Sequence, residues 1–522
     1  MTTSIVPPTC TSKYSSRIRL STPDTSDNLA EGSAAANQTK PIPLHLKVVA
    51  ICLISIISCS WQWSLGVSRA LKSTIKEEMN ISNTEFSLLE GSEDFMTTVL
   101  IIPSGILADR VGGSVSLVYG QTVFMIGAIL LATATTIRSY DFMIAGKIIL
   151  SVGQIFSEIS QCKMFSAWFA PGKGFAVTLG IESALGKVGG FVGIATANII
   201  AEKYGFEWSF WVAAFISIFG NAVTLLFWLL DRYCARRYDA PMDDANGDNL
   251  RMSKEKFNFQ KIFQFPWMLW AIFGFSTFES AASEVFSQNA TELAQKRFNV
   301  DPVPAGWYSA VSEYGGLVLC PLLGIFLDRY GKRVFAMLFL ASFLLLGMLL
   351  LNFALSKAGT ALSFAVYGIV KGTTSTIMVD SIRTIIWEEA VFGTACAFRL
   401  TSHDAMGIII RLVTGVLQDL DNDSYHRVNY VYLGLAVVSM VIALAILVAA
   451  LWGNDFGPLQ WSRKRRFTDG PRLLAELRDH HFVRNYRRTR HISIGCFSAM
   501  LALILASWGV YIWGAVTGHN YD

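Results

Sequence analysis

Two copies of one motif decide the fold: Gly105-Ile-Leu-Ala-Asp109-Arg110-Val-Gly112-Gly113, and Gly324-Ile-Phe-Leu-Asp328-Arg329-Tyr-Gly331-Lys332-Arg333. Each copy follows a long apolar run and combines small residues with an acid–base pair and a glycine turn. Small residues let helices approach closely in a membrane, and internal duplication around a membrane core is typical of transporters. The repeat therefore predicts two similar halves, in which Asp109–Arg110 and Asp328–Arg329 act as gating pairs.

The composition indicates that the chain lies in a bilayer. Of its 522 residues, 52% are hydrophobic and only 16% are charged, whereas soluble domains carry about 25% charged residues. The eight cysteines show no Cys-x-x-Cys or other metal-ligand spacing, so we expect no disulfide framework, no metal site and no cofactor. The sequence also has no nucleophile elbow and no phosphate-binding loop, so no enzyme activity is predicted.

Apolar runs of about 20 residues cross a bilayer as helices, and such runs predict an all-α polytopic protein. We expect two bundles of six spans and a separate thirteenth span. The spans lie near 47–67, 87–107, 115–136, 140–162, 174–198, 208–230, 266–288, 306–327, 334–353, 358–379, 394–416, 428–452 and 492–515.

These spans divide the chain into six segments. The first is a Ser/Thr/Pro-rich tail expected to be disordered in the cytosol. A first bundle, a cytosolic linker and a second bundle follow. A basic cytosolic segment then precedes a further membrane helix with a short non-cytosolic tail. In order, the boundaries are 1–46, 47–230, 231–265, 266–452, 453–491 and 492–522.

Basic residues set the predicted orientation, because cytosolic loops are enriched in Lys and Arg. The linker and the cluster 463–466 are basic and lie on the same side as the N-terminus. We therefore place the N-terminus in the cytosol. Asn80, Asn289 and Asn422 each begin an Asn-x-Ser/Thr sequon in a loop predicted on the opposite side, where glycosylation takes place.

Glu158 in the fourth span and Lys187 in the fifth are the principal candidates for cargo binding. An ionisable group within a bilayer costs about 2.5–3.5 kcal/mol or more and usually faces a cavity. Both residues lie at a similar distance from the turn near Pro171, and so at a similar depth. Glu182, on the same span as Lys187, is a further candidate for cargo binding. Two interpretations remain open: the pair recognises the two charges of a zwitterion, or it forms a salt bridge between helices.

Other spans carry further charges. Glu90, Glu93 and Asp94 in the second span either couple transport to protons or line an aqueous mouth. Lys371 in the tenth span or Arg411 in the eleventh is expected to face the cavity and bind cargo. Arg399, at the start of the eleventh span, is expected to gate the cytosolic side.

This organisation resembles the major facilitator superfamily, in which two six-helix bundles are joined by a cytosolic linker. The resemblance covers roughly residues 47–452 and includes the repeated Gly-x-x-x-Asp-Arg motif. Ser114 and Val115 stand where the family motif has a basic pair in its first copy. The resemblance implies alternating-access transport of a small molecule.

One segment is similar to a lysosomal, dipeptide-transporting branch of that superfamily. It runs from Glu158 through Trp168-Phe169-x-x-Gly172-Lys173 to Ala184-Leu-Gly-Lys187-Val-Gly189. The similarity implies that Glu158 binds the amino terminus of a peptide and Lys187 its carboxylate. The branch has arginine where this chain has Lys187, and lysine lacks the planar fork that binds a carboxylate through two hydrogen bonds.

The location and partners are predicted from the C-terminal part. Asp469-Gly-Pro-Arg-Leu473-Leu474 fits an acidic dileucine sorting signal, which favours a lysosomal or vacuolar membrane, or else it begins an amphipathic helix. A plasma-membrane location remains open. The expected partners are the cargo and anionic lipid, not nucleic acid, and the resemblance leaves open an accessory glycoprotein subunit. Two rival functions also remain: a proton-coupled organic-anion or sugar permease, and a non-transporting sensor or scaffold.

Overall fold

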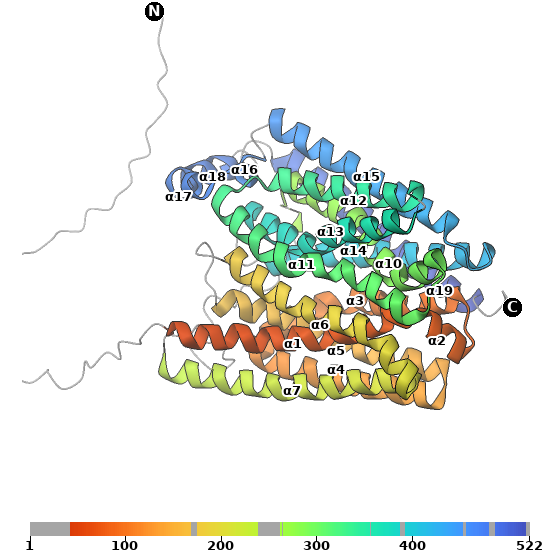
Figure 1. The fold of residues 1–522 in the computed structure, drawn as a ribbon. Helices are drawn as coiled ribbons and strands as arrows, with labels where there is room; N and C mark the ends of the chain where they lie inside the picture. The colour runs from red at the N-terminus through yellow and green to blue at the C-terminus, as the bar shows by residue number, and fades with distance from the viewer. Residues whose placement is uncertain are drawn as a thin grey trace, which may run out of the picture. The chain divides into compact units, whose positions relative to one another are not determined.

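In the part of the chain that the structure describes, thirteen helices of 21 to 32 residues run back and forth (Figure 1). The computed structural model describes residues 42–168, 175–238, 262–263, 265–354, 356–386, 392–452, 456–479 and 486–517. All of them belong to one unit that extends from Pro41. We call the end of this unit that contains the short helix α2 (Lys72–Met79) the α2 end. The α18 end contains the short helix α18 (Gly470–Asp479).

The first bundle contains six long helices. In it α1 pairs with α6 and α7, α4 with α5 and α7, and α3 with α5. The helices are α1 (Leu44–Ala70), α3 (Asn83–Val111), α4 (Gly113–Ile137), α5 (Tyr140–Trp168), α6 (Phe175–Tyr204) and α7 (Phe206–Arg237).

The second bundle repeats the same pairings. Here α10 pairs with α14 and α15, α12 with α13 and α15, and α11 with α13. Helix by helix, these pairs are the counterparts of those in the first bundle, as the duplicated motif predicts. The helices are α10 (Trp267–Phe298), α11 (Pro302–Tyr330), α12 (Arg333–Phe353), α13 (Lys357–Ile385), α14 (Phe392–Leu420) and α15 (His426–Trp452).

Each copy of the motif makes the turn for which its glycine was expected. Gly112 has φ 96° and Gly331 has φ 72°, a backbone region that glycine adopts without steric cost. The next helix begins directly after each turn, α4 at Gly113 and α12 at Arg333. A Cβ atom on Gly331 would also overlap the carbonyl oxygen of Trp461.

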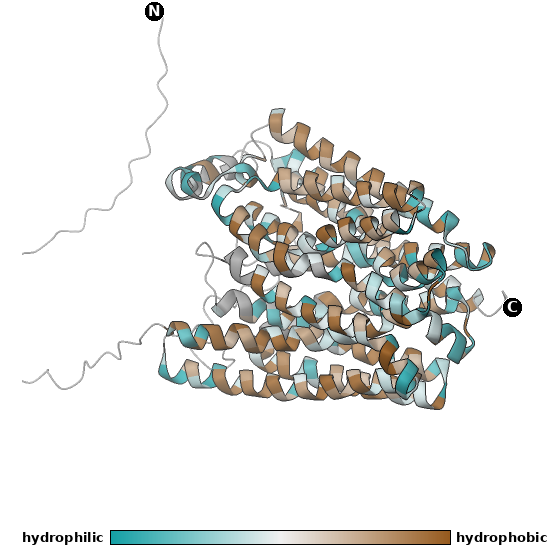
Figure 2. Ribbon diagram, in the orientation of Figure 1, coloured by the Kyte–Doolittle hydropathy of each residue, from teal (hydrophilic) through white to brown (hydrophobic). Residues whose placement is uncertain are grey.

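The expected all-helical membrane fold is confirmed. Eleven of the described helices are long and apolar enough to cross a bilayer. The two other long helices, α3 and α10, carry several acidic residues each, and both pack at the contact between the bundles. Apolar residues predominate along α7 and α15 at the two outer edges of the helix array (Figure 2).

Some boundaries differ from the expected ones. Helix α7 continues to Arg237, beyond the expected end of its span, and a last helix, α19 (Tyr486–Thr517), begins before residue 492. Polar residues extend both helices because backbone hydrogen bonds continue outside the apolar stretch. Between α15 and α19 lie α16 (Gly457–Gln460), α17 (Arg463–Thr468) and α18, with α16 packed on α12 and α13.

The bundles meet along two lines of contact, α6 with α11 and α3 with α14. These are equivalent pairs, because each joins the fifth helix of one bundle to the second helix of the other. Several buried charged side chains lie on these helices, among them Lys187, Glu313, Asp94 and Arg411.

Candidate functional site

Lys187 lies on α6 at the first line of contact and extends between α11 and α13. Its side chain is 8% exposed, and its Nζ donates a hydrogen bond to the backbone carbonyl oxygen of Lys371 at 3.1 Å. Gly316 and Gly372 leave room for this approach, since a Cβ on Gly316 would overlap the Lys187 side chain. Within the described part of the chain, no carboxylate lies within ion-pair distance of the Lys187 ammonium.

Four further charged residues are linked to Lys187 through its contact with the backbone of Lys371. Lys371 of α13 forms an ion pair with Glu313 of α11 and a hydrogen bond with Ser287. Arg69 of α1 lies 2.6 Å from Glu284 and 3.6 Å from Glu313, measured from its Nη atoms to the carboxylate oxygens. We call Arg69, Lys187, Lys371, Glu284 and Glu313 the cation cluster, because three cations face two carboxylates.

Glu158 lies near the second line of contact, on α5. Among charged groups, Asp404 and Arg399 of α14 act on it most strongly. Its partners are thus different from those of Lys187, and the two side chains form no ion pair with one another in the described residues. Glu182 accepts a hydrogen bond from Ser58 at 2.5 Å and acts on Lys187 from beyond ion-pair distance.

Acidic side chains predominate around Glu158. Glu279 of α10 accepts hydrogen bonds from Thr374 at 2.7 Å and from Ser280 at 3.1 Å. The Arg399 Nη1 group donates to Ser276 at 3.3 Å, and its Nε has no partner in the described structure. The His403 Nδ1 atom lies 2.9 Å from Asp404. We call Glu158, Glu279, Arg399, His403 and Asp404 the acid cluster; three carboxylates there face one guanidinium.

The three acids of α3 that were predicted to couple protons or to line a mouth all have cationic partners. Lys147 of α5 lies 3.1 Å from Glu90 and 3.0 Å from Glu93, which joins two helices of the first bundle. Asp94 accepts a hydrogen bond from Arg411 of α14 at 2.8 Å, and Arg411 also contacts Gln288 of α10. The Asp94–Arg411 pair therefore joins the two bundles, and Arg411 does so from the position where cargo contact was predicted.

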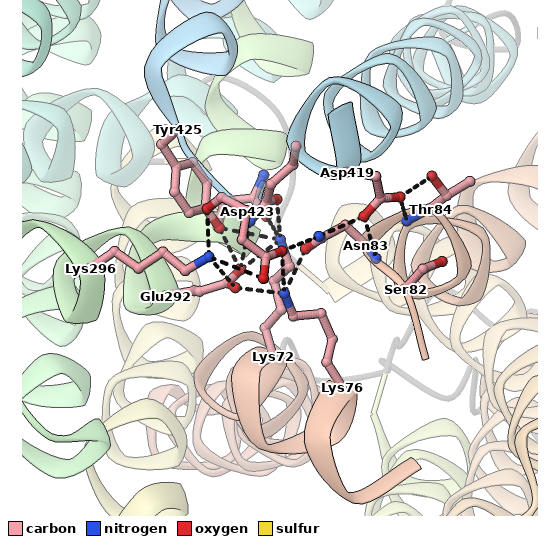
Figure 3. Close-up of polar contacts among 12 residues, drawn as sticks. Lys72, Lys76, Ser82, Asn83, Thr84, Glu292, Lys296, Asp419, Asp423 and Tyr425 are labelled. Carbon is pink, nitrogen blue, oxygen red and sulfur yellow. Dashed lines mark hydrogen bonds and ion pairs between the residues drawn. The ribbon is translucent and has the colours of Figure 1, made fainter. Parts of the chain in front are cut away.

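At the α2 end, charged residues of both bundles interlock (Figure 3). Lys72 Nζ lies 2.9 Å from Glu292 and donates to Asn289 at 2.7 Å. Lys76 lies 2.8 Å from Glu292 and 3.2 Å from Asp423. We call this group the gate cluster; its members are Lys72, Lys76, Asn83, Glu292, Lys296, Asp419, Asp423 and Tyr425.

The first turn of α3 completes the gate cluster. Asn83 and Thr84 donate their backbone N–H groups to the two carboxylate oxygens of Asp419, at 3.0 and 2.9 Å. An Asp carboxylate at a helix N-terminus also interacts favourably with the helix dipole. Burial acts to raise the pKa of Asp423, but the hydrogen bond from Asn83 and the nearby lysines outweigh it and hold that pKa below its ordinary value.

Sequence reasoning did not assign the gate cluster. A signal was present, since basic residues of α2 and acidic residues of the α14–α15 loop fall on the same side of the predicted topology. The Asn289 sequon was misplaced: Asn289 is 4% exposed within α10 and bonds both Lys72 and Tyr432. Asn80 and Asn422 are exposed residues with positive φ at turns.

Of the two predicted gating pairs, the structure describes the side chains of the second only. The side chains of Asp109 and Arg110 lie outside the described residues. Asp328 is half-buried, and the Arg329 guanidinium lies 5.7 Å from the Tyr330 ring. The motif also provides Arg333, which sequence reasoning did not single out as a site residue. Its Nε lies 2.6 Å from Asp380 of α13.

The predicted sorting signal falls at the start of α18. Asp469 is exposed, and its backbone carbonyl accepts a hydrogen bond from the N–H of Leu473 at 3.0 Å. Leu473 and Leu474 are half-buried on the same helix. The helical conformation agrees with the amphipathic alternative, and the sorting role stays a prediction.

Two equivalent six-helix bundles, with charged side chains concentrated between them, define the fold of a secondary transporter. A model of the Major Facilitator Superfamily matches residues 52–410. The chain therefore belongs to this superfamily, whose members are membrane transporters.

Several relatives carry one name. The chain is 20% identical to the "Lysosomal dipeptide transporter MFSD1" of Mus musculus, over 82% of this chain and 91% of the relative. It is 20% identical to the Homo sapiens protein of that name, over 85% and 95%. A crystal structure of the E. coli fucose:proton symporter FucP has a TM-score of 0.55 and 13% identity, covering 77% of this chain and 99% of that one. The latter likeness shows the fold alone.

Proposed function

We propose that the protein moves dipeptides, or similar small zwitterions, out of a lysosomal or vacuolar lumen by alternating access. The name of the relatives supports the cargo class and the compartment. The charge distribution supports a zwitterion, because a cation-rich and an acid-rich cluster are built from helices of both bundles.

The ammonium of Lys187 carries this proposal. It is buried, and its hydrogen bond goes to a neutral carbonyl oxygen. A buried charge without a counter-ion costs several kcal/mol, so such a charge is retained where it serves a function. A carboxylate on the cargo supplies the missing counter-ion, and Glu158 in the acid cluster takes the ammonium group at the other end.

In this proposal, the gate cluster opens and closes the α2 end during alternating access. It connects α2 and α3 of the first bundle with α10 and α14 of the second, which closes the α2 end. Transport then requires these ion pairs to separate while contacts at the α18 end form. With the N-terminus in the cytosol, the α2 end faces the lumen.

The first test is thermal stabilisation of the purified protein by dipeptides, single amino acids, sugars and organic acids at pH 5 and pH 7. We expect stabilisation by dipeptides that disappears in Glu158→Gln and in Lys187→Ala and persists in Lys187→Arg. Lys357→Gln, an exposed lysine at the start of α13, is the matched control. A response to sugars or organic acids alone would contradict the proposed cargo.

A second test separates transport from sensing. The protein is reconstituted in liposomes loaded with a labelled dipeptide, and efflux is followed with and without a pH gradient. A transporter releases the dipeptide faster than protein-free liposomes do. Binding without net flux would instead identify a sensor, and flux that depends on the gradient and on Glu90, Glu93 or Asp94 would identify proton coupling.

A further inference from the structure

Two lysines from opposite bundles converge in the cation cluster. Lys187 of the first bundle ends at the backbone of Lys371 in the second. Gly316 and Gly372, on α11 and α13, allow these two helices and the Lys187 side chain to share one narrow space. The Lys187 ammonium therefore lies at the backbone of Lys371, whose own ammonium contacts Ser287 and Glu313.

Glu313 holds the central position among these cations. It forms an ion pair with Lys371 and lies 3.6 Å from Arg69, and Lys187 acts on it electrostatically. The Glu313 side chain is 3% exposed. One carboxylate thus serves cations that come from both bundles.

The charge count of the cluster is incomplete. Three cations face Glu284 and Glu313, and Arg69 already occupies Glu284 at 2.6 Å. Glu182 of α6 acts on Lys187 only from beyond ion-pair distance, so no carboxylate of the described residues contacts the Lys187 ammonium. A carboxylate placed against that ammonium would lower the cost of burying it. The cargo carboxylate of the proposed function has the charge that is missing.

We infer that Lys371 is a second cargo-binding residue and that Glu313 is its resident counter-ion, which Lys371 exchanges for the carboxylate of the cargo. The inference rests on the proposed function for the identity of the cargo. In the exchange, the Lys371 ammonium moves from Glu313 to the cargo carboxylate, which Lys187 binds from the other side. Arg69 then becomes the partner of Glu313.

The exchange makes a free carboxylate on the cargo a condition for tight binding. Two ammonium groups converge on that carboxylate, and a C-terminal amide offers no charge to either. The exchange also couples cargo binding to the relative position of the bundles. Arg69 and Glu313 belong to opposite bundles, and their ion pair forms when cargo takes Lys371. The cargo carboxylate must replace Glu313 as the partner of Lys371, so a stronger Glu313–Lys371 ion pair lowers the affinity for cargo.

The test compares binding of one dipeptide with binding of its C-terminal amide and of its N-acetyl form. Dissociation constants are measured for the purified wild type, Lys371→Gln, Glu313→Gln and the double variant, with Lys357→Gln as control. In Lys371→Gln we expect the preference for the free acid over the amide to fall about tenfold, the equivalent of one charged hydrogen bond. The preference for a free amino terminus should not change.

The direction of the affinity change in Glu313→Gln distinguishes counter-ion exchange from a structural role. Without its resident counter-ion Lys371 is available to cargo, so the free acid should bind more tightly than to the wild type and the amide should not. A merely structural pair would instead weaken every ligand alike. If a single variant does not fold, the double variant removes both charges together, so that neither Lys371 nor Glu313 is left as the uncompensated half of their pair; it should resemble Lys371→Gln.

The outcomes distinguish the two proposals. An unchanged free-acid preference in folded Lys371→Gln or in the double variant overturns the inference and leaves the proposed function intact. A wild type that binds a non-peptide carboxylate, with the same dependence on Lys371, overturns the dipeptide cargo and supports the inference. A wild type that binds no carboxylate at all overturns both.

Discussion

Single residues decide where the charges of this transporter lie. Lys187 reaches the second bundle because two glycines replace side chains along its path. At Gly316 a methyl group would occupy space that the Lys187 methylene groups fill, and the backbone of Gly372 lies directly behind. The missing side chain is therefore as important to the site as the lysine is.

Gly316→Ala should displace Lys187 from its site. The added Cβ overlaps the lysine chain, and overpacking of this kind costs about 1–3 kcal/mol. We expect a lower melting temperature and weaker binding of a dipeptide free acid relative to its amide. Gly434→Ala is the control, because nothing lies within 4 Å of a Cβ there. Identical behaviour of the two variants would contradict the packing argument.

Asp423 should keep the gate cluster insensitive to moderate acid. Burial raises its pKa, but Asn83, Lys76 and Lys296 outweigh that effect, and its pKa is depressed. A depressed pKa means that the contribution is complete above the unfolded value, about 3.9, and is lost only as the pH falls through the folded value. The α2 end should therefore stay closed from pH 7.5 to pH 5.

The measurement is the distance between spin labels at the exposed positions 80 and 422, recorded across that pH range. In Asp423→Asn the closed fraction should fall slightly at every pH, about twofold in the equilibrium constant, because a half-exposed pair contributes about 0.5 kcal/mol. A closed fraction that falls steeply between pH 7.5 and pH 5 in the wild type would contradict the depressed pKa.

At the scale of elements, α19 is attached to both bundles. Near its start, Ser493 donates to the carbonyl oxygen of Phe265 at 2.6 Å, beside α10. Near its end, Trp508 donates its indole N–H to Thr98 of α3 at 2.8 Å, and the Tyr511 and Phe95 rings stack at 4.8 Å. The thirteenth helix thus spans the contact between α3 and α14.

Trp508→Ala should loosen the contact of α19 with the first bundle. It removes one hydrogen bond and part of a ring contact with Phe95, so we expect about 1–2 kcal/mol of destabilisation in thermal unfolding. A double-mutant cycle with Thr98→Ala should yield a coupling energy of about 0.5–1.5 kcal/mol. Trp513→Ala, at a ring that is 49% exposed, is the control, and zero coupling would refute the contact.

At the scale of the whole molecule, the most buried ionic contact between the two pseudo-equivalent bundles at the α2 end is formed by Glu292. Glu292 is 2% exposed and has three lysines within 4 Å, Lys72 and Lys76 on α2 and Lys296 on its own helix. Tyr425 donates its hydroxyl to the same carboxylate at 2.6 Å. Glu292 is therefore the most highly connected of the carboxylates that close this end, beside Asp419 and Asp423.

Glu292→Gln should open the α2 end. Removing one partner of a buried ion pair leaves uncompensated charge and costs about 3–5 kcal/mol. This cost destabilises the closed state relative to the open state. We expect the distance between labels at positions 80 and 422 to increase in most molecules. Glu78→Gln is the matched control, because its pair with Arg138 lies within the first bundle and is largely exposed. An unchanged distance would show that other contacts close this end.

Much of this fold could be predicted from the sequence alone. The repeated Gly-x-x-x-Asp-Arg motif and the apolar runs give two bundles, because a bilayer admits few structures besides apolar helices. The motif glycines adopt the positive φ angles that the expected turns require. Helix ends were less predictable, since polar residues continue α7 to Arg237 and hydropathy does not detect them.

The chemistry between the bundles could be predicted only in part. Sequence spacing indicated that Glu158, Lys187, Lys371 and Arg411 are buried charges of functional interest. It could not indicate that Lys187 donates a hydrogen bond to the backbone of Lys371, or that Arg411 forms an ion pair with Asp94. Such pairings join residues far apart in the chain, and helix periodicity contains no information about them.

The sequence by itself thus determined the membrane setting, the two-fold duplication and the presence of buried charges, because hydropathy and local turns are properties of short segments. The tertiary structure decided which charges are neutralised, which carboxylates join the bundles at the α2 end, and that Lys187 has no carboxylate partner in the described residues. Electrostatic energy depends on distances between atoms across helices, and only the packing of α6 on α11 and α3 on α14 sets those distances.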